Sequence, residues 1–213
     1  MSRRLRLRNR RTFTSRRPWA DDRASQIVEF ALSLPLLVLF VVGIFDFSGA
    51  ISLKQKLTNA AREAARVAAA DPANDLSGTS LPMPVSVNDA VQVVDNYLVS
   101  EKINDCQLTG AAPTPGGGLT WSFNANPQTN GCPAPGITLT INRGFYFPQT
   151  ATGQVSTGCA SVQPTAGQTA AVGTCVIIQY PYKWQFTSVS GLLGGRFLGP
   201  SVLTTTAVAF NEN

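Results

Sequence analysis

The most apolar part of the chain lies near its N-terminus, over residues 27–47. Only Glu29 and Asp46 carry a charge within these 21 residues. A helix needs roughly 20 residues to cross a bilayer core about 30 Å thick, so the pattern predicts one membrane span. The alternative is a cleaved secretory signal, whose apolar part covers about 7–15 residues and ends at a small-residue site. This stretch is longer, and no A-x-A pattern closes it.

The helical pattern continues beyond the apolar stretch. Over residues 48–70, apolar residues recur mostly every three or four positions, and alanine, the best helix former, dominates. Asp71-Pro72 ends the pattern, because the residue before a proline avoids the helical region. The sequence therefore predicts one helix over residues 25–70. Its second part, 48–70, is amphipathic and needs a surface to pack against.

The rest of the chain mixes one further helix with short strands. A second helix is predicted over Asn88–Ser100, with Asn88 as its N-cap. Residues 111–118 and 126–136 are rich in glycine and proline and are predicted to be loops. Four strands are predicted, at 119–123, 137–145, 175–184 and 201–210. The second of these strands alternates apolar and polar residues with the period of two expected for a half-buried strand.

These elements predict an α+β fold, in which a small antiparallel sheet buries the amphipathic part of the long helix. The chain then divides into a basic leader (1–24), a long helix (25–70) and an α+β domain (71–213). About 140 residues follow the long helix, which is enough for one hydrophobic core.

Charge is distributed unevenly along the chain. The net charge is +5, but residues 1–23 alone carry +7 and the remainder carries −2. A basic segment before an apolar stretch indicates that the N-terminus lies in the cytoplasm and that the domain is exported. Because the basic residues precede the apolar stretch, the pattern does not indicate a nucleic-acid partner. Asp46, at the outer end of the stretch, is expected to be exposed to water.

All four cysteines lie beyond the predicted span: Cys106, Cys132, Cys159 and Cys175. An even number of cysteines on the exported side indicates two disulfides. Three pairings are open, and pairing between sequence neighbours is expected because each bond would close a loop rich in glycine and proline. Four reduced, buried cysteines are the alternative. No zinc site is expected, because histidine and C-x-x-C spacing are both absent from the sequence.

The sequence carries no recognisable catalytic motif. Without histidine there is no Ser-His or Cys-His pair, and the acids of the exported part are scattered. We therefore expect no enzyme activity and no cofactor, with an exported hydrolase as the alternative. An aromatic group comprises Tyr180, Tyr182, Trp184 and Phe186. Packing in the core and at its edge is expected for this group, with a carbohydrate-binding or partner-binding surface as the alternative.

Two sequence blocks carry a family resemblance. ASQIVEFALSLPLLVLFVVGIFDF at 24–47 and NAAREAAR at 59–66 resemble TadE-like proteins of the tight-adherence (Tad) secretion system. Those proteins are minor, pilin-like subunits. The matching features are an acid followed by an aromatic residue, a later proline, an acid at the far end and the A-A-R-E motif: Glu29, Phe30, Pro35, Asp46 and residues 60–63. The closing strands resemble the family less strongly.

The resemblance implies a role for the residues around Glu29. A prepilin peptidase would cut between Ala24 and Ser25, where alanine stands in place of the family's usual glycine. The Glu29 carboxylate would then pair with the new N-terminal amine of a neighbouring subunit, in an apolar surround where such attraction is strong. The alternative is an interfacial acid that reaches the lipid head groups. Pro35 either kinks the helix or has no role.

The resemblance therefore implies a non-enzymatic minor pilin-like subunit of a Tad-type pilus. Its function would lie in pilus assembly, surface adhesion or secretion. Its expected partners are the bilayer, other pilin subunits, prepilin peptidase and the proteins of the assembly platform. The alternative is a single-pass, signal-anchored exported domain that binds a ligand such as carbohydrate and does not polymerise.

Overall fold

The computed structural model describes residues 22–72, 83–126, 130–147, 158–159, 171–184 and 200–212. The chain divides into two compact units, residues 1–43 and residues 44–213, and each is described by itself. Most of the predicted leader and Phe186 of the aromatic group lie outside the described residues.

Helix α1 (Asp22–Ala70) begins in the first unit and ends in the second. Within the first unit, the described side chains from Ser25 to Gly43 are mostly exposed, including Phe30, Leu37 and Phe40. Pro35 lies inside the helix without ending it. By length and composition, α1 is able to cross a membrane. A long N-terminal helix with an apolar first part was predicted, and the structure confirms it.

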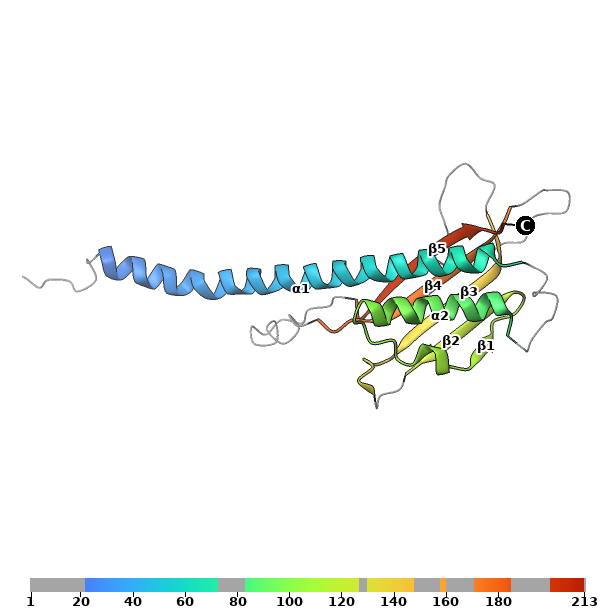
Figure 1. Ribbon diagram of the computed structural model, residues 1–213. Helices are drawn as coiled ribbons and strands as arrows, with labels where there is room; N and C mark the ends of the chain where they lie inside the picture. The colour runs from blue at the N-terminus through green and yellow to red at the C-terminus, as the bar shows by residue number, and fades with distance from the viewer. Residues whose placement is uncertain are drawn as a thin grey trace, which may run out of the picture. The chain divides into compact units, whose positions relative to one another are not determined.

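The second unit contains a five-stranded antiparallel sheet in the order β1-β2-β3-β4-β5 (Figure 1). The strands are β1 (Pro113–Pro115), β2 (Thr120–Ala125), β3 (Ile137–Tyr146), β4 (Val172–Pro181) and β5 (Val202–Phe210). Four of them lie where the sequence predicted strands, and the α+β class is confirmed. The period of two in β3 buries Ile137, Leu139 and Ile141.

Strand β1 was predicted to be part of a loop, and that prediction was wrong. Its three residues pair with β2, from Pro113 opposite Phe123 to Pro115 opposite Trp121. Proline cannot donate to a sheet ladder, so the sequence argued against a strand there. At an edge of the sheet, however, only one side of the strand needs partners, and this short segment is at an edge.

Helix α2 (Val85–Ser100) begins three residues earlier than predicted, and Asn88 is not its N-cap. Pro84 occupies the N-cap position, and its carbonyl oxygen accepts from the backbone N–H groups of Val87 and Asn88, both at 3.1 Å. Proline already has the backbone φ that a helix start tolerates. The Pro84 carbonyl oxygen therefore accepts the first hydrogen bonds of the helix, and the side chain of Asn88 is not needed as a cap.

The second part of α1 and helix α2 cover the same face of the sheet (Figure 1). The buried face of α1 consists mainly of alanines together with Leu57, and it packs in one core with α2 and the inner side chains of the sheet. The Thr58 hydroxyl lies 2.9 Å from that of Thr205 on β5. Alanine side chains are short, so the helix backbone lies close to the strands. The predicted burial of the amphipathic part of α1 is confirmed.

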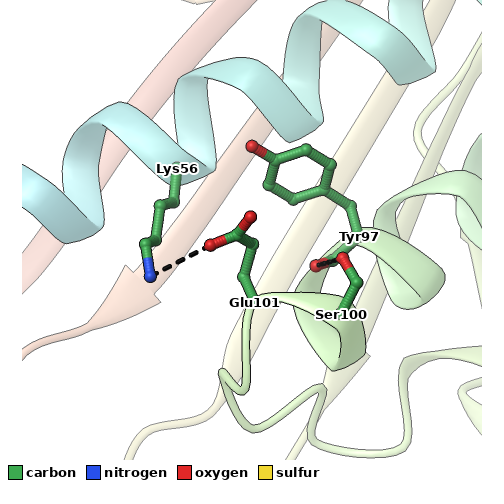
Figure 2. Close-up of polar contacts among 4 residues, drawn as sticks. All are labelled: Lys56, Tyr97, Ser100 and Glu101. Carbon is green, nitrogen blue, oxygen red and sulfur yellow. Dashed lines mark hydrogen bonds and ion pairs between the residues drawn. The ribbon is translucent and has the colours of Figure 1, made fainter.

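An ion pair joins the outer sides of the two helices. Figure 2 shows Lys56 of α1 reaching Glu101 at the C-terminal end of α2, with 3.0 Å between Nζ and Oε2. The ring of Tyr97 points from α2 toward α1 beside this pair (Figure 2). Because both charged side chains are partly exposed, the pair contributes at most about 1 kcal/mol. The packed apolar face accounts for most of the attachment of α1.

A buried arginine holds the C-terminal end of α1. Arg143 of β3 has no exposed surface, and its Nη2 donates to the Asp71 carbonyl oxygen at 3.0 Å. Its Nη1 donates to the Thr174 hydroxyl at 3.3 Å. The last turn of α1 has no basic residue of its own, and a cation there interacts favourably with the free carbonyls and the helix dipole. The guanidinium of Arg143 supplies that cation from the sheet.

We expect Arg143→Met to destabilise the protein by roughly 3 kcal/mol, because it leaves buried acceptors without their charged donor. The free energy of unfolding of the full chain in detergent, from guanidinium titration, would measure this. Arg66→Met is the matched control, since its side chain is exposed and pairs with Glu63 of the same helix, at 3.7 Å. Equal losses in the two variants would contradict a special role for the buried arginine.

Candidate functional site

The residues assigned to peptidase cleavage and subunit pairing lie in the first turns of α1. Ala24 and Ser25 are both inside the helix, which begins at Asp22. The side chains of Glu29 and Phe30 are exposed. Cleavage at Ala24–Ser25 and pairing through Glu29 stay predictions.

The acid at the other end of the apolar stretch was expected to be exposed to water, and that expectation was wrong. The side chain of Asp46 is buried, with 6% of its surface exposed. The Tyr182 hydroxyl reaches both the backbone carbonyl oxygen of Asp46, at 3.0 Å, and its Oδ1, at 3.1 Å. Tyr182 directly follows β4, so the sheet covers this turn of the helix and satisfies its carboxylate.

A glycine makes this contact geometrically possible. Gly49 lies one turn beyond Asp46, and a Cβ atom built on it would lie 3.0 Å from the Tyr182 hydroxyl oxygen. Any larger residue would press on the hydroxyl. Glycine in a helix interior costs roughly 1 kcal/mol relative to alanine, so its presence here is explained by the close approach of Tyr182. We call Asp46, Gly49 and Tyr182 the helix latch.

Aromatic side chains surround the helix latch. The ring of Trp184 packs edge-on against Phe47 of α1, with centroids 5.1 Å apart, and against Tyr182, at 4.9 Å. Trp184 donates from its indole Nε1 to the Pro200 carbonyl oxygen at 2.8 Å. Burial first, and then the hydrogen bond with Asp46, raises the pKa of Tyr182. The hydroxyl therefore stays protonated and remains a donor.

Tyr180, also in the predicted aromatic group, packs in the main core. Its hydroxyl donates to the Asn104 carbonyl oxygen at 3.0 Å and so joins β4 to the loop after α2. Burial raises its pKa, and the charge of Asp105 adds to this. Tyr180 and Trp184 are buried, which confirms the core packing expected for these two members of the group.

Both disulfides join sequence neighbours, as expected. Cys106 bonds to Cys132, and Cys159 bonds to Cys175. The first bond ties the loop after α2 to the segment before β3, and both its residues belong to the main core. The second bond attaches Cys159 to Cys175 of β4. The side-chain amide of Asn142, on the neighbouring strand β3, donates to the Cys159 carbonyl oxygen at 2.7 Å. The segment between Cys106 and Cys132 was expected to be a loop with little structure, but it contains β1 and β2.

The structure brings together two carboxyl groups that look scattered in the sequence. Asp95 of α2 lies beside Asp105 of the following loop, close enough for the charge of Asp105 to act on it. Burial, and then the neighbouring charge of Asp105, raises the pKa of Asp95. Asp105 also accepts from the backbone N–H of Gln107 at 3.1 Å. The chain turns back after α2 and so brings the two residues together. They are ten residues apart in the sequence, and no sequence pattern predicted that they would meet.

The family model for TadE-like protein matches residues 24–66. This segment is about a fifth of the chain, and it holds the exposed apolar part of α1 and most of its alanine face. The resemblance carried by the sequence is confirmed over this segment. No match was found among curated proteins. The solved structures likewise gave no match.

The helix latch predicts a measurable coupling between Gly49 and Tyr182. We expect Tyr182→Phe to lower the free energy of unfolding by about 1 kcal/mol, since Asp46 loses a hydrogen bond. Gly49→Ala alone should gain less than the roughly 1 kcal/mol given by helix propensity, because its Cβ meets the hydroxyl. In the Tyr182→Phe background, Gly49→Ala should raise the free energy of unfolding by the full amount of roughly 1 kcal/mol. A double-mutant cycle on the full chain measures this coupling, and simple additivity would contradict the close contact.

The Asp95–Asp105 pair predicts a pH dependence of stability. Because the folded-state pKa of Asp95 is raised above its ordinary 3.8, the folded chain keeps a proton that the unfolded chain releases, and stability falls as pH rises from 3.8 through the raised value. Asp95→Asn should therefore raise the thermal midpoint at about pH 7, with the gain shrinking below the ordinary pKa of Asp.

Asp89→Asn is the matched control for this experiment. It removes one negative charge from the same helix. We expect no gain in thermal midpoint from it. A gain of equal size in both variants would mean that net charge, and not the carboxyl pair, sets the effect.

Proposed function

We propose that this chain is a non-enzymatic, minor pilin-like subunit of a Tad-type pilus. In this proposal the first part of α1 crosses the cytoplasmic membrane, the N-terminus lies in the cytoplasm, and the domain that begins near Asp46 is exported. Its role is in pilus assembly, surface adhesion or secretion. Its partners are the bilayer, other pilin subunits, a prepilin peptidase and the proteins of the assembly platform.

The match of the TadE-like family model to residues 24–66 is the observation that carries this proposal. The matched segment coincides with a physical change along α1. Its first part exposes apolar side chains, and its second part is buried by the sheet and α2. A helix with these two surfaces can hold a folded domain at a membrane or in an assembly of like helices.

Glu29 is the residue proposed to pair subunits. It is an acid in the exposed apolar part of α1. An unpaired carboxylate in an apolar surround is costly, and pairing with a neighbour's amine removes that cost. Cleavage at Ala24–Ser25 would produce such an amine four residues before Glu29. Cleavage and pairing therefore belong to one mechanism, in which an uncut chain lacks the partner group.

Mass spectrometry of the chain produced with a Tad prepilin peptidase tests the proposal. We expect a mature N-terminus at Ser25. Glu29→Ala should lower the fraction assembled into sheared pili by more than about tenfold, as expected for the loss of one member of a buried ion pair. Glu63→Ala is the control, because this exposed acid contacts Arg66 of its own helix.

An intact leader, together with normal behaviour of Glu29→Ala, would contradict the pilin proposal. That result would favour an anchored binding domain that does not polymerise. Turnover of a glycan or peptide substrate by the purified full chain would contradict both non-enzymatic functions.

A further inference from the structure

A shallow cleft of about 300 Å³ runs along an outer face of α1, within the second unit. It is lined by Ile51, Lys54, Gln55, Thr58, Asn59 and Arg62. These positions recur at three- and four-residue intervals, so they form one stripe of the helix. The stripe includes two basic residues and no acidic residue. An anion placed in this cleft therefore meets only favourable charges among its lining residues.

The two cations of the cleft differ from the other two on this part of α1. Lys56 pairs with Glu101 at 3.0 Å, and Arg66 pairs with Glu63 at 3.7 Å. Among the described residues, neither cleft cation has an acidic group within 4.0 Å. Their charges are not neutralised within this part of the protein. The charge pattern thus favours an external anion at the cleft and not at the paired positions.

The position of the cleft along the helix indicates where such an anion comes from. Exposed apolar side chains continue through Phe47 to Ile51, which is 57% exposed and is the first residue of the cleft. At 1.5 Å per residue, Lys54 lies about 10 Å beyond Phe47 along the axis. The head-group layer is roughly 5–8 Å thick on each side of the bilayer core, and a lysine side chain bends toward such a layer over several ångströms.

We propose that Lys54, with Ile51 beside it, binds the head group of an anionic phospholipid in the outer half of the bilayer. This inference rests on the membrane anchoring proposed above and adds a lipid preference to it. Arg62 lies about 12 Å farther along the helix than Lys54 and is too far out to contact the same head group. The contributions of the two cations therefore differ according to their depth.

The test uses the full chain in lipid nanodiscs that contain equal amounts of phosphatidylglycerol and phosphatidylcholine. Native mass spectrometry counts the lipids that stay bound after release. We expect an excess of bound phosphatidylglycerol, which Lys54→Gln lowers about fivefold, the effect of one cation at a charged membrane surface. Arg62→Gln should lower it less than about twofold, because it lies more than a Debye length from the head groups.

Lys56→Gln is the matched control, since it removes the same charge from a residue that is paired with Glu101. All variants keep the arginine-rich leader, so its contribution to lipid binding cancels in the comparison. An unchanged excess in Lys54→Gln would overturn the proposal, as would equal losses in the Lys54 and Arg62 variants, which would indicate an elongated acidic partner. Loss of the excess on adding inorganic phosphate would indicate a free-anion site and would also overturn it.

Failure of this inference is distinguishable from failure of the proposed function. A chain that enters the nanodiscs without any lipid preference overturns only the head-group site. A chain that does not enter them overturns the membrane anchoring as well, and with it the head-group site.

Discussion

Close packing of the alanine face of α1 on the sheet is the interaction on which the rest of this structure depends. The first part of α1 exposes apolar side chains, and the second part packs its alanine face closely against the sheet. Alanine serves the second requirement, because it favours helix and lets the strands approach. The change from one surface to the other takes about one turn, from half-exposed Phe47 to buried Ala50.

That single turn explains why the helix latch has its particular residues. An acid at the end of an apolar stretch would be exposed to solvent if the domain began farther along the chain. Here the second unit begins at Ile44 and Asp46 is buried within it, so the carboxylate needs a donor, and Tyr182 supplies one. The donor approaches so closely that a Cβ atom on Gly49 would lie only 3.0 Å from its oxygen. Just beyond the other end of α1, Arg143 donates to the Asp71 carbonyl oxygen.

Sequence reasoning was most successful where the signal is local and periodic. The long helix, the strand at residues 137–145 and the exchange of exposed for buried faces near residue 48 follow from period and composition. The pairing of the cysteines also agrees, because each bond closes a short loop. The start of α2 was misplaced by three residues, since a backbone carbonyl on Pro84 did the work expected of Asn88.

What the sequence could not supply were contacts between distant segments. Tyr182 meets Asp46 across 136 residues, and Arg143 meets Asp71 across 72. Such pairs leave no pattern in either segment alone. An acid at the end of an apolar helix and a strand that ends in aromatic residues were the available signals for the helix latch. The buried arginine had none, because the same residue in a strand is usually exposed.

The position of β5 has a consequence for the order in which the protein folds. This strand is the last of the five described strands in sequence order, yet its Thr205 contacts Thr58 across 147 residues. The backbone N–H of Glu212 donates to the Ala69 carbonyl oxygen at 3.0 Å. Contacts this distant in sequence form slowly, since a long loop must close first. The alanine face of α1 is therefore incompletely covered until β5 has been synthesised. A chain without β5 would leave part of this face exposed to chaperones and proteases.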